Sequence, residues 1–309
     1  MTAETGVIVV RGSVPPLVRA LRPHQWPKNL IVFAALIFST GAAWHPSDAT
    51  SWWPLLWRSI VMFGAWCAAS SAVYLVNDTR DREHDRRHPR KASRPIAAGD
   101  VSTMTALRVA TVLLVIAIPV GFALGPIAGA VLSGYVVLML GYSAGLKSVP
   151  LVDVLILCAG VVARAVAGAG AIDVTISPWL YICSSLGAFF FASCKRWAEF
   201  RQLGGPAAAQ HRPALAHYDA RLLSWMVGLG AAGTVISYAA YTFLSSHVPS
   251  NGAMALTIPF VAFGLFRFLF LIRGPRQAEA PDRILFTDSA ILASMACFVA
   301  VALGVLVVR

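Results

Sequence analysis

Charged residues are scarce in this sequence. Asp, Glu, Lys and Arg make up 13% of its 309 residues, against about 25% in ordinary soluble domains. Hydrophobic residues make up 58%, and several long apolar stretches follow one another, as helices that cross a membrane require. Ten-residue segments of alternating hydrophobicity, which outer-membrane barrels show, are missing. The composition excludes a soluble globular protein and predicts an all-α protein with many transmembrane helices.

Cysteines and acidic residues are also few. The five cysteines all fall in apolar segments and form no Cys-x-x-Cys pair, so we expect buried thiols, with neither disulfides nor a zinc site.

The first residues lack the basic stretch of a secretory signal, and we expect no cleaved leader. The net charge is +11. Because the basic residues are spread through short loops, cytoplasmic loops explain this charge better than nucleic-acid binding, and no nucleic-acid partner is expected.

The apolar stretches, separated by loop signals, predict nine spans. The segment 1–28 is expected to be a cytoplasmic N-terminal segment, and 29–309 a single transmembrane domain. The first span is short and could be extended or tilted at its ends. The predicted spans are residues 29–44, 52–76, 103–124, 126–143, 151–171, 178–200, 219–245, 253–272 and 286–308.

Lys and Arg are absent from alternate connections between these spans, namely residues 45–51, 125, 172–177 and 246–252. The other main connections are basic and include Arg11, Arg212 and Arg276. This asymmetry predicts that the N-terminus and the basic loops lie in the cytoplasm. An odd number of spans then puts the C-terminus outside a plasma membrane, and it gathers the charge-dense loops on one membrane face.

An unusual concentration of charge follows the second span, in VYLVNDTRDREHDRRHPRKASRPIAAG. Asn77, Asp81 and Asp85 are spaced four residues apart, so they share one face if the helix continues, with Asp78 beside them. Oxygen ligands placed in this way suit Mg²⁺, which commonly bridges one or two carboxylates to substrate phosphates. The alternative interpretation is a solvated helix end, in which the neighbouring arginines neutralise the acids.

Basic residues recur where other spans reach the same face. In the sixth span, Lys195 and Glu199 are four residues apart and Arg196 adjoins them. They indicate either a helix-end ion pair or a phosphate clamp in which Glu199 is open to sugar hydroxyls or a metal. Arg94 could likewise bind a phosphate with its guanidinium fork, or be only a topological basic residue. Further candidates are Tyr142 and Lys147 in one loop and Lys28 before the first span.

Two arginines lie unusually deep. Arg164 stands about three turns into the fifth span, and Arg267 lies within the eighth. An ionisable residue inside a span points to a functional site with a partner in the bundle. For Arg164, pairing with a carboxylate and contact with a ligand remain alternatives. Arg267 could instead extend its side chain to the membrane edge.

The motif NDxxDxxxD at 77–85, followed by RPIAAG, resembles the UbiA superfamily of intramembrane prenyltransferases. The number of spans, their orientation and the loop with Tyr142 and Lys147 fit that family over nearly the whole chain. The resemblance implies nine helices around a central cavity that opens to the cytoplasmic side. It also implies that the first aspartate-rich motif holds the diphosphate of a donor through Mg²⁺.

The sequence lacks the second aspartate-rich motif that typical members carry on the sixth span. Lys195, Arg196 and Glu199 occupy that region instead. This departure, together with RPHQWPKNLIVFAALIFS near the start, resembles the branch that transfers phosphoribose. The resemblance implies 5-phosphoribosyl 1-diphosphate as donor and a polyprenyl (decaprenyl) phosphate in the bilayer as acceptor. The transfer would be the first step toward a lipid-linked arabinose donor for cell-wall arabinan, and a homo-oligomer is compatible with the sequence.

The predicted site combines the motif residues with the basic groups. The expected catalytic residues are Asp78, Asp81, Asp85 and Lys195, and the expected Mg²⁺ ligands are Asn77, Asp81 and Asp85. The expected substrate-binding residues are Lys28, Tyr74, Asn77, Arg82, Arg94, Tyr142, Lys147, Arg164, Arg196 and Glu199.

Two other functions remain as alternatives. One is a prenyltransferase of the same superfamily that uses a prenyl diphosphate and an aromatic or haem acceptor; the missing second motif counts against it. The other is a membrane transporter with a charged vestibule, although the sequence shows no convincing internal repeat.

Overall fold

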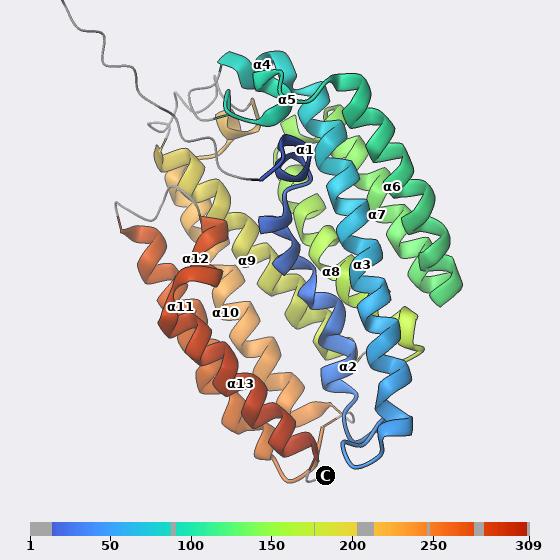
Figure 1. The fold of residues 1–309 in the computed structure, drawn as a ribbon. Coiled ribbons are helices and arrows are strands. Elements are labelled where there is room, and N and C mark those ends of the chain that lie inside the picture. The colour runs from blue at the N-terminus through green and yellow to red at the C-terminus, as the bar shows by residue number, and fades with distance from the viewer. Residues whose placement is uncertain are drawn as a thin grey trace, which may run out of the picture.

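The computed structural model describes residues 14–87, 91–175, 177–202, 213–245, 248–274 and 281–307. This part of the chain consists mostly of helices and contains no β-strand, which confirms the predicted all-α class (Figure 1). Arg11, Arg212 and Arg276, which contributed to the predicted orientation, lie outside the described residues.

The helices follow the order of the predicted spans, with short helices between them. The elements are α1 Pro16–Ala20, η1 Pro23–Phe33, α2 Ala34–Phe38, α3 Ala49–Arg80, α4 Arg82–Arg87, α5 Pro95–Ala98, α6 Thr103–Leu124, α7 Pro126–Ala144, η2 Leu146–Ser148, α8 Val152–Ile172, α9 Pro178–Gln202, η4 Pro213–His217, α10 Ala220–Leu244, η5 Ala253–Thr257, α11 Ile258–Arg273, α12 Pro281–Thr287 and α13 Ser289–Val307.

Among the described residues, seven helical stretches are long and apolar enough to cross a membrane. They are α3, α6, α7, α8, α10, the stretch Ala253–Arg273 formed by η5 and α11, and α13. The other two predicted spans correspond to η1 with α2 and to α9, which lie in the same bundle (Figure 1) but do not meet that measure of length and hydropathy. The chain is therefore a multi-pass membrane protein, and the count of nine spans is not confirmed.

Local sequence explains where several helices begin. Asp48 accepts a hydrogen bond from the backbone N–H of Thr50 and so caps α3. Ser102 caps α6 in the same way, and Asp219 caps α10. Such caps satisfy backbone donors that have no partner inside the helix. Each of these polar residues therefore fixes the first turn of a long apolar helix.

The two ends of the bundle differ in charge. The charged end comprises the last turn of α3, α4, α5, η2, the first turn of α8 and the last turns of α9. The far end comprises the loop after α2, Gly125 between α6 and α7, and residues 173–175 after α8. In Figure 1 the charged end is at the top, where α4 and α5 lie. A cavity of about 360 Å³ lies at the far end, between α2 and the loop that follows α8.

The first span corrects the prediction of a helix over 29–44. The chain forms the 3₁₀ helix η1 over Pro23–Phe33 and continues as α2 only to Phe38. A 3₁₀ helix rises about 2.0 Å per residue, against 1.5 Å in an α-helix, so this short segment extends over about 30 Å. The greater rise per residue of η1 compensates for the shortness of the segment. Because η1 starts at Pro23, the bundle also begins before the predicted domain boundary at 29.

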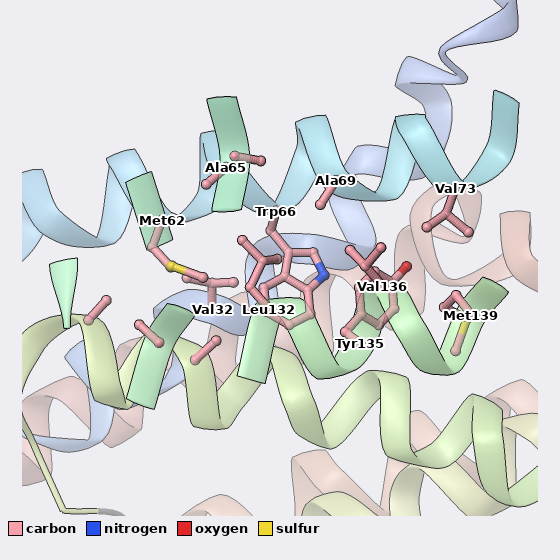
Figure 2. Close-up of a cluster of buried hydrophobic side chains, with 14 of the residues drawn as sticks. Val32, Met62, Ala65, Trp66, Ala69, Val73, Leu132, Tyr135, Val136 and Met139 are labelled. Carbon is pink, nitrogen blue, oxygen red and sulfur yellow. The ribbon is translucent and has the colours of Figure 1, made fainter. Parts of the chain in front are cut away.

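Aromatic and aliphatic side chains join α3, α7 and η1 in the largest buried cluster (Figure 2). Trp66 of α3 packs against Tyr135 of α7, with ring centroids 5.0 Å apart. Val32 of η1 is fully buried in the same cluster. Contacts of this kind fix how closely neighbouring helices approach one another, and they hold η1 against α3.

Candidate functional site

The motif aspartates lie where α3 gives way to α4. Helix α3 ends at Arg80, and Asp81 occupies its C-cap with a φ of −85° and a ψ of 3°. The backbone hydrogen bonds nevertheless continue across the break, because Asp81 N–H donates to Asn77 and Asp85 N–H donates to Asp81. The shared face was expected if the helix continued past the second span; α3 ends at Arg80 and α4 begins at Arg82, with one residue between them.

Asp78 is held by two arginines that are distant in sequence. Its carboxylate accepts hydrogen bonds from Arg22 at 2.6 and 2.8 Å and from Arg94 at 3.2 Å. The side chain of Asp78 is only 4% exposed, and a buried carboxylate is stable only with such partners. Arg22 also lies over the ring of Tyr74, with its guanidinium carbon 5.0 Å from the ring centroid. Asp78 therefore anchors the N-terminal segment to the end of α3.

Asp81 is the most accessible of the three motif aspartates. Its two carboxylate oxygens accept hydrogen bonds from Lys147 of η2, at 2.8 and 2.9 Å. Asn77, one turn earlier, accepts a hydrogen bond from the hydroxyl of Ser143 at 2.9 Å. The end of α7 and the η2 loop therefore lie directly against the motif.

Asp85 is buried, and its carboxylate is only partly satisfied by hydrogen bonds. One of its oxygens accepts a hydrogen bond from Arg94 at 2.6 Å. The other, Oδ1, has no hydrogen-bond partner among the described residues, and the Lys91 amine lies 3.9 Å away. Burial and the nearby Arg94 lower the pKa of Lys91, while the negative charges of Asp85, Asp81 and Glu199 act in the opposite direction.

The donor set fits a Mg²⁺ ion that is shared with a phosphate ligand. No group of three His, Cys, Asp or Glu side chains in the described part of the chain is arranged to hold a metal by itself. Mg²⁺ is nevertheless commonly bound through one or two carboxylates together with substrate phosphates and water. The accessible carboxylate of Asp81 and the unpartnered Oδ1 of Asp85 are oxygen donors of that kind.

The second group of predicted residues surrounds Arg196, which is 1% exposed. Its guanidinium pairs with Asp153 of α8 at 2.7 Å, and it donates to Glu199, three residues further along α9. Glu199 is partly accessible, with 29% of its side chain exposed. Arg196 thus joins α9 to α8 and holds Glu199, and the helix-end ion pair is formed by Arg196 with Glu199.

The end of α7 connects the two groups. Ser143 donates to Asn77 of the first group, while the hydroxyl of Tyr142 accepts from Arg196 at 3.5 Å. Glu199 also lies close enough to Lys91 to affect its pKa. The structure therefore brings together motifs that are more than a hundred residues apart in the sequence.

Arg164 lies deeper, in a polar layer between aromatic rings. It donates to Asn29 at 2.8 Å and to the carbonyl of Gly160. Its guanidinium carbon stands 5.5 Å from the ring of Trp66 and 5.1 Å from that of Tyr135. Among the described residues no carboxylate pairs with it, so aromatic faces and neutral oxygens stabilise this charge.

The remaining candidates lie nearer the surface of the charged end. Lys195 is half-buried in α9, and Lys28 is half-buried in η1. Arg82 has a buried Nε without a hydrogen-bond partner in the described part of the chain. Arg267 in α11 has 34% of its side chain exposed and pairs with Asp288, just before α13, at 3.0 Å.

Sequence reasoning missed three members of these networks. Arg22 was only one of several N-terminal basic residues, and nothing marked it as the partner of Asp78. Asp153 carried a usable signal, because an isolated acid in the first turn of an apolar span requires a partner. Tyr218 donates to Asp153 at 3.0 Å and carried no distinctive signal.

The chain is similar to proteins of a known family over most of its length. The model of a family described as the UbiA prenyltransferase family matches residues 31–290. The chain is 33% identical over 293 residues to the decaprenyl-phosphate phosphoribosyltransferase of Mycolicibacterium smegmatis, covering 89% of each protein. It is 32% identical over 269 residues to the protein of the same name from Mycobacterium tuberculosis, covering 87% of each.

Other relatives show the fold more than the detailed activity. A solved UbiA homolog from Archaeoglobus fulgidus, bound to GPP and Mg²⁺, has a TM-score of 0.71 at 18% identity, covering 95% of this chain and 100% of that one. The mitochondrial 4-hydroxybenzoate polyprenyltransferase of Bos taurus is 34% identical over 101 residues, or 31% of this chain and 25% of that protein. The arrangement of helices in this structure is thus one that also occurs in a metal-bound and GPP-bound relative.

Proposed function

The chain belongs to the UbiA prenyltransferase family, and from this premise we propose that it transfers 5-phosphoribose from 5-phosphoribosyl 1-diphosphate to a polyprenyl phosphate. Diphosphate is the leaving group. The observation that carries the proposal is the extent of the similarity. Relatives named decaprenyl-phosphate phosphoribosyltransferase match 87–89% of the chain, whereas the 4-hydroxybenzoate polyprenyltransferase matches 31%.

The charges at the site support such a donor. Breaking the bond between C1 and the leaving oxygen places negative charge on diphosphate and positive character on the ribose. Mg²⁺, held by Asn77, Asp81 and Asp85, would supply Lewis-acid stabilisation of the leaving group. Lys147 and Arg94 lie beside the same acids. In this proposal they bind the phosphate oxygens of the donor, with Arg82 as a further donor of hydrogen bonds.

The acceptor needs binding but no activation. A polyprenyl phosphate is already an anion at neutral pH, so no general base is assigned. Lys195 and Lys28 bind its head group, and Glu199, held by Arg196, orients a ribose hydroxyl. Attack from the face opposite to the diphosphate inverts the configuration at C1. Arg164 contributes positive potential from the polar layer below the site.

The chain is proposed to lie in a plasma membrane with its charged end in the cytoplasm and its C-terminus outside. Basic loops favour the cytoplasmic face, which is also where a soluble sugar phosphate donor is available. The lipid tail of the acceptor stays in the bilayer along the apolar spans. The product would supply a later pathway to a lipid-linked arabinose donor for cell-wall arabinan.

The test is a transfer assay with purified protein. Radiolabelled 5-phosphoribosyl 1-diphosphate, Mg²⁺ and decaprenyl phosphate are incubated in detergent micelles, and label is measured in the lipid phase. We expect Mg²⁺-dependent transfer that a chelator abolishes. Absence of this transfer, together with transfer from a prenyl diphosphate to 4-hydroxybenzoate, would refute the proposal in favour of an aromatic prenyltransferase.

A further inference from the structure

We propose that Tyr218 is a positioning residue for the η2 loop: its hydroxyl holds a strained turn at Leu151, and this turn sets the place of Lys147 beside Asp81. The inference rests on the proposed function, because it is Lys147 that is assigned to the donor phosphates. It adds to that function a residue from the segment before α10, which is far in sequence from the aspartate-rich motif.

The strained turn lies between η2 and α8. Leu151 has a φ of 63° and a ψ of −42°, a combination that side chains other than glycine rarely adopt. Val152 N–H donates to the carbonyl of Pro150 at 2.7 Å, two residues back, which makes this a γ-turn with positive φ. Turns of that type are strained, and they persist only where the surrounding structure holds them.

The hydroxyl of Tyr218 stabilises this strained turn. The oxygen accepts a hydrogen bond from Leu151 N–H at 2.7 Å, and its proton is donated to Asp153 at 3.0 Å. Tyr218 is 5% exposed and Asp153 is fully buried, so water cannot easily replace either bond. Burial raises the pKa of Tyr218 to about 12, which keeps the hydroxyl protonated at neutral pH.

Asp153, which accepts the hydrogen bond from Tyr218, is itself held in place. It lies in the first turn of α8 and pairs with Arg196 of α9, which is itself buried. The hydroxyl of Tyr218 is therefore attached to a carboxylate that α8 and α9 hold in place. A tyrosine attached in this way can determine the conformation of the segment that contacts it.

Only a short, hydrogen-bonded piece of chain separates Leu151 from Lys147. Ser148 N–H donates to Gly145, and Val149 N–H donates to Leu146 at 3.1 Å, so hydrogen bonds tie η2 together as one unit. If the turn relaxed to negative φ, the η2 unit would rotate and carry Lys147 away from Asp81. Small displacements of a binding group reduce substrate affinity strongly, because the charge no longer meets the phosphate.

The main test is the Tyr218→Phe variant, which removes only the hydroxyl. We expect the KM for 5-phosphoribosyl 1-diphosphate to rise about tenfold while kcat changes less than threefold, since a ground-state binding contact is displaced. Leu151→Gly in the same chain should restore the KM to within about twofold of wild type, because glycine adopts positive φ without strain. Rescue by relief of backbone strain is not expected if Tyr218 is only a packing residue.

Tyr238→Phe is the matched control. Tyr238 is 3% exposed, and its hydroxyl is hydrogen-bonded to Thr257 at 2.6 Å near the far end of the bundle. This variant loses the same chemical group from a buried place, and its KM should equal that of wild type. An unchanged KM in Tyr218→Phe, or a raised KM that Leu151→Gly does not correct, would overturn the inference.

A second measurement needs no turnover. Acetylation of Lys147 by an amine reagent, followed by peptide mass spectrometry, reports whether its amine is still held by Asp81. Tyr218→Phe should increase the labelling rate severalfold, and the double variant with Leu151→Gly should return it to the wild-type rate. If the variants show this labelling pattern but wild type shows no transfer from 5-phosphoribosyl 1-diphosphate, the proposed function fails and the positioning role stands. Equal labelling in all variants, with normal transfer in wild type, refutes the positioning role alone.

Discussion

At the scale of single residues, exposure separates the three motif aspartates. The side chains of Asp78 and Asp85 are 4% and 1% exposed, whereas that of Asp81 is 24% exposed. Asp78 is held by Arg22 and Arg94, and Asp85 by Arg94, so both also brace the chain around the motif. Asp81 can exchange its contact with Lys147 for a metal or water at little structural cost. It is therefore the residue whose loss should affect chemistry most and folding least.

Asp81→Asn keeps the shape of the side chain and removes its charge. We expect transfer to fall by about a hundredfold or more, because electrostatic stabilisation of the leaving group depends on this carboxylate. The thermal unfolding midpoint should stay within a few degrees of wild type, since Lys147 is 30% exposed and remains hydrated. Initial rates and scanning fluorimetry measure the two quantities.

Glu83→Gln provides the matched control for Asp81. Glu83 lies two residues further along, and its side chain is 71% exposed in a surface pair with Arg86. Neither rate nor midpoint should change measurably. Near-normal transfer in Asp81→Asn would contradict the metal-holding role.

Substitution by methionine should lower the unfolding midpoint at Arg196 but not at the adjacent Lys195 of α9. Arg196→Met leaves the fully buried Asp153 without its cation, and breaking such a pair costs about 3–5 kcal/mol. We expect the unfolding midpoint to fall by roughly 5 °C or more. Lys195→Met, at a half-buried position, should leave the midpoint nearly unchanged and weaken binding of the acceptor phosphate. Equal midpoints in the two variants would show that Arg196 is not the structural member of the pair.

At the scale of elements, the first span depends on one glycine of α8. A Cβ atom added at Gly168 would lie 2.0 Å from the carbonyl oxygen of Val32, so any side chain there must displace η1. Asn29 of η1 also accepts a hydrogen bond from Arg164 of the same α8. Because Arg22 precedes η1 and binds Asp78, the position of η1 also affects the charged end.

Gly168→Ala tests this dependence. Overpacking of a close contact typically costs about 1–3 kcal/mol, so we expect a lower unfolding midpoint and reduced transfer. Gly228→Ala in α10 is the control, because nothing lies within 4 Å of the added Cβ. It should be neutral or stabilising by up to about 1 kcal/mol. If both variants unfold at the same temperature, the contact between η1 and α8 is looser than the structure indicates.

The elements also show what the sequence could predict. Long apolar stretches predicted most helices to within a few residues, because a membrane span requires both length and hydropathy. The 3₁₀ form of η1 was not predictable, since hydropathy does not distinguish a rise of 2.0 Å per residue from one of 1.5 Å. The acids were recognised by their spacing. Their cations were not assigned, because Arg22 lies 56 residues from Asp78 and Lys147 lies 66 residues from Asp81, and only folding brings them together.

At the scale of the whole molecule, the proposed function requires the charged end to face the cytoplasm. The two ends differ sharply: Arg80, Arg86 and Lys91 lie at the charged end, whereas the far-end loop over residues 39–48 contains no Lys or Arg. A donor that carries several phosphates cannot cross the bilayer unaided, so the site must open to the compartment that contains it. The opposite orientation would leave the site without its substrate.

Cysteines introduced at the two ends measure the orientation directly. Ser47→Cys lies in the exposed loop before α3, and Glu83→Cys lies in α4 at the charged end. In intact spheroplasts a membrane-impermeant maleimide should label Ser47→Cys at once and Glu83→Cys only after the membrane is permeabilised. Wild type gives the background, because its cysteines all lie within helices of the bundle, most of them buried or half-buried. The reverse labelling order would place the charged end outside the cell, and because the donor is made in the cytoplasm, the transfer reaction proposed for this chain would then have to be abandoned.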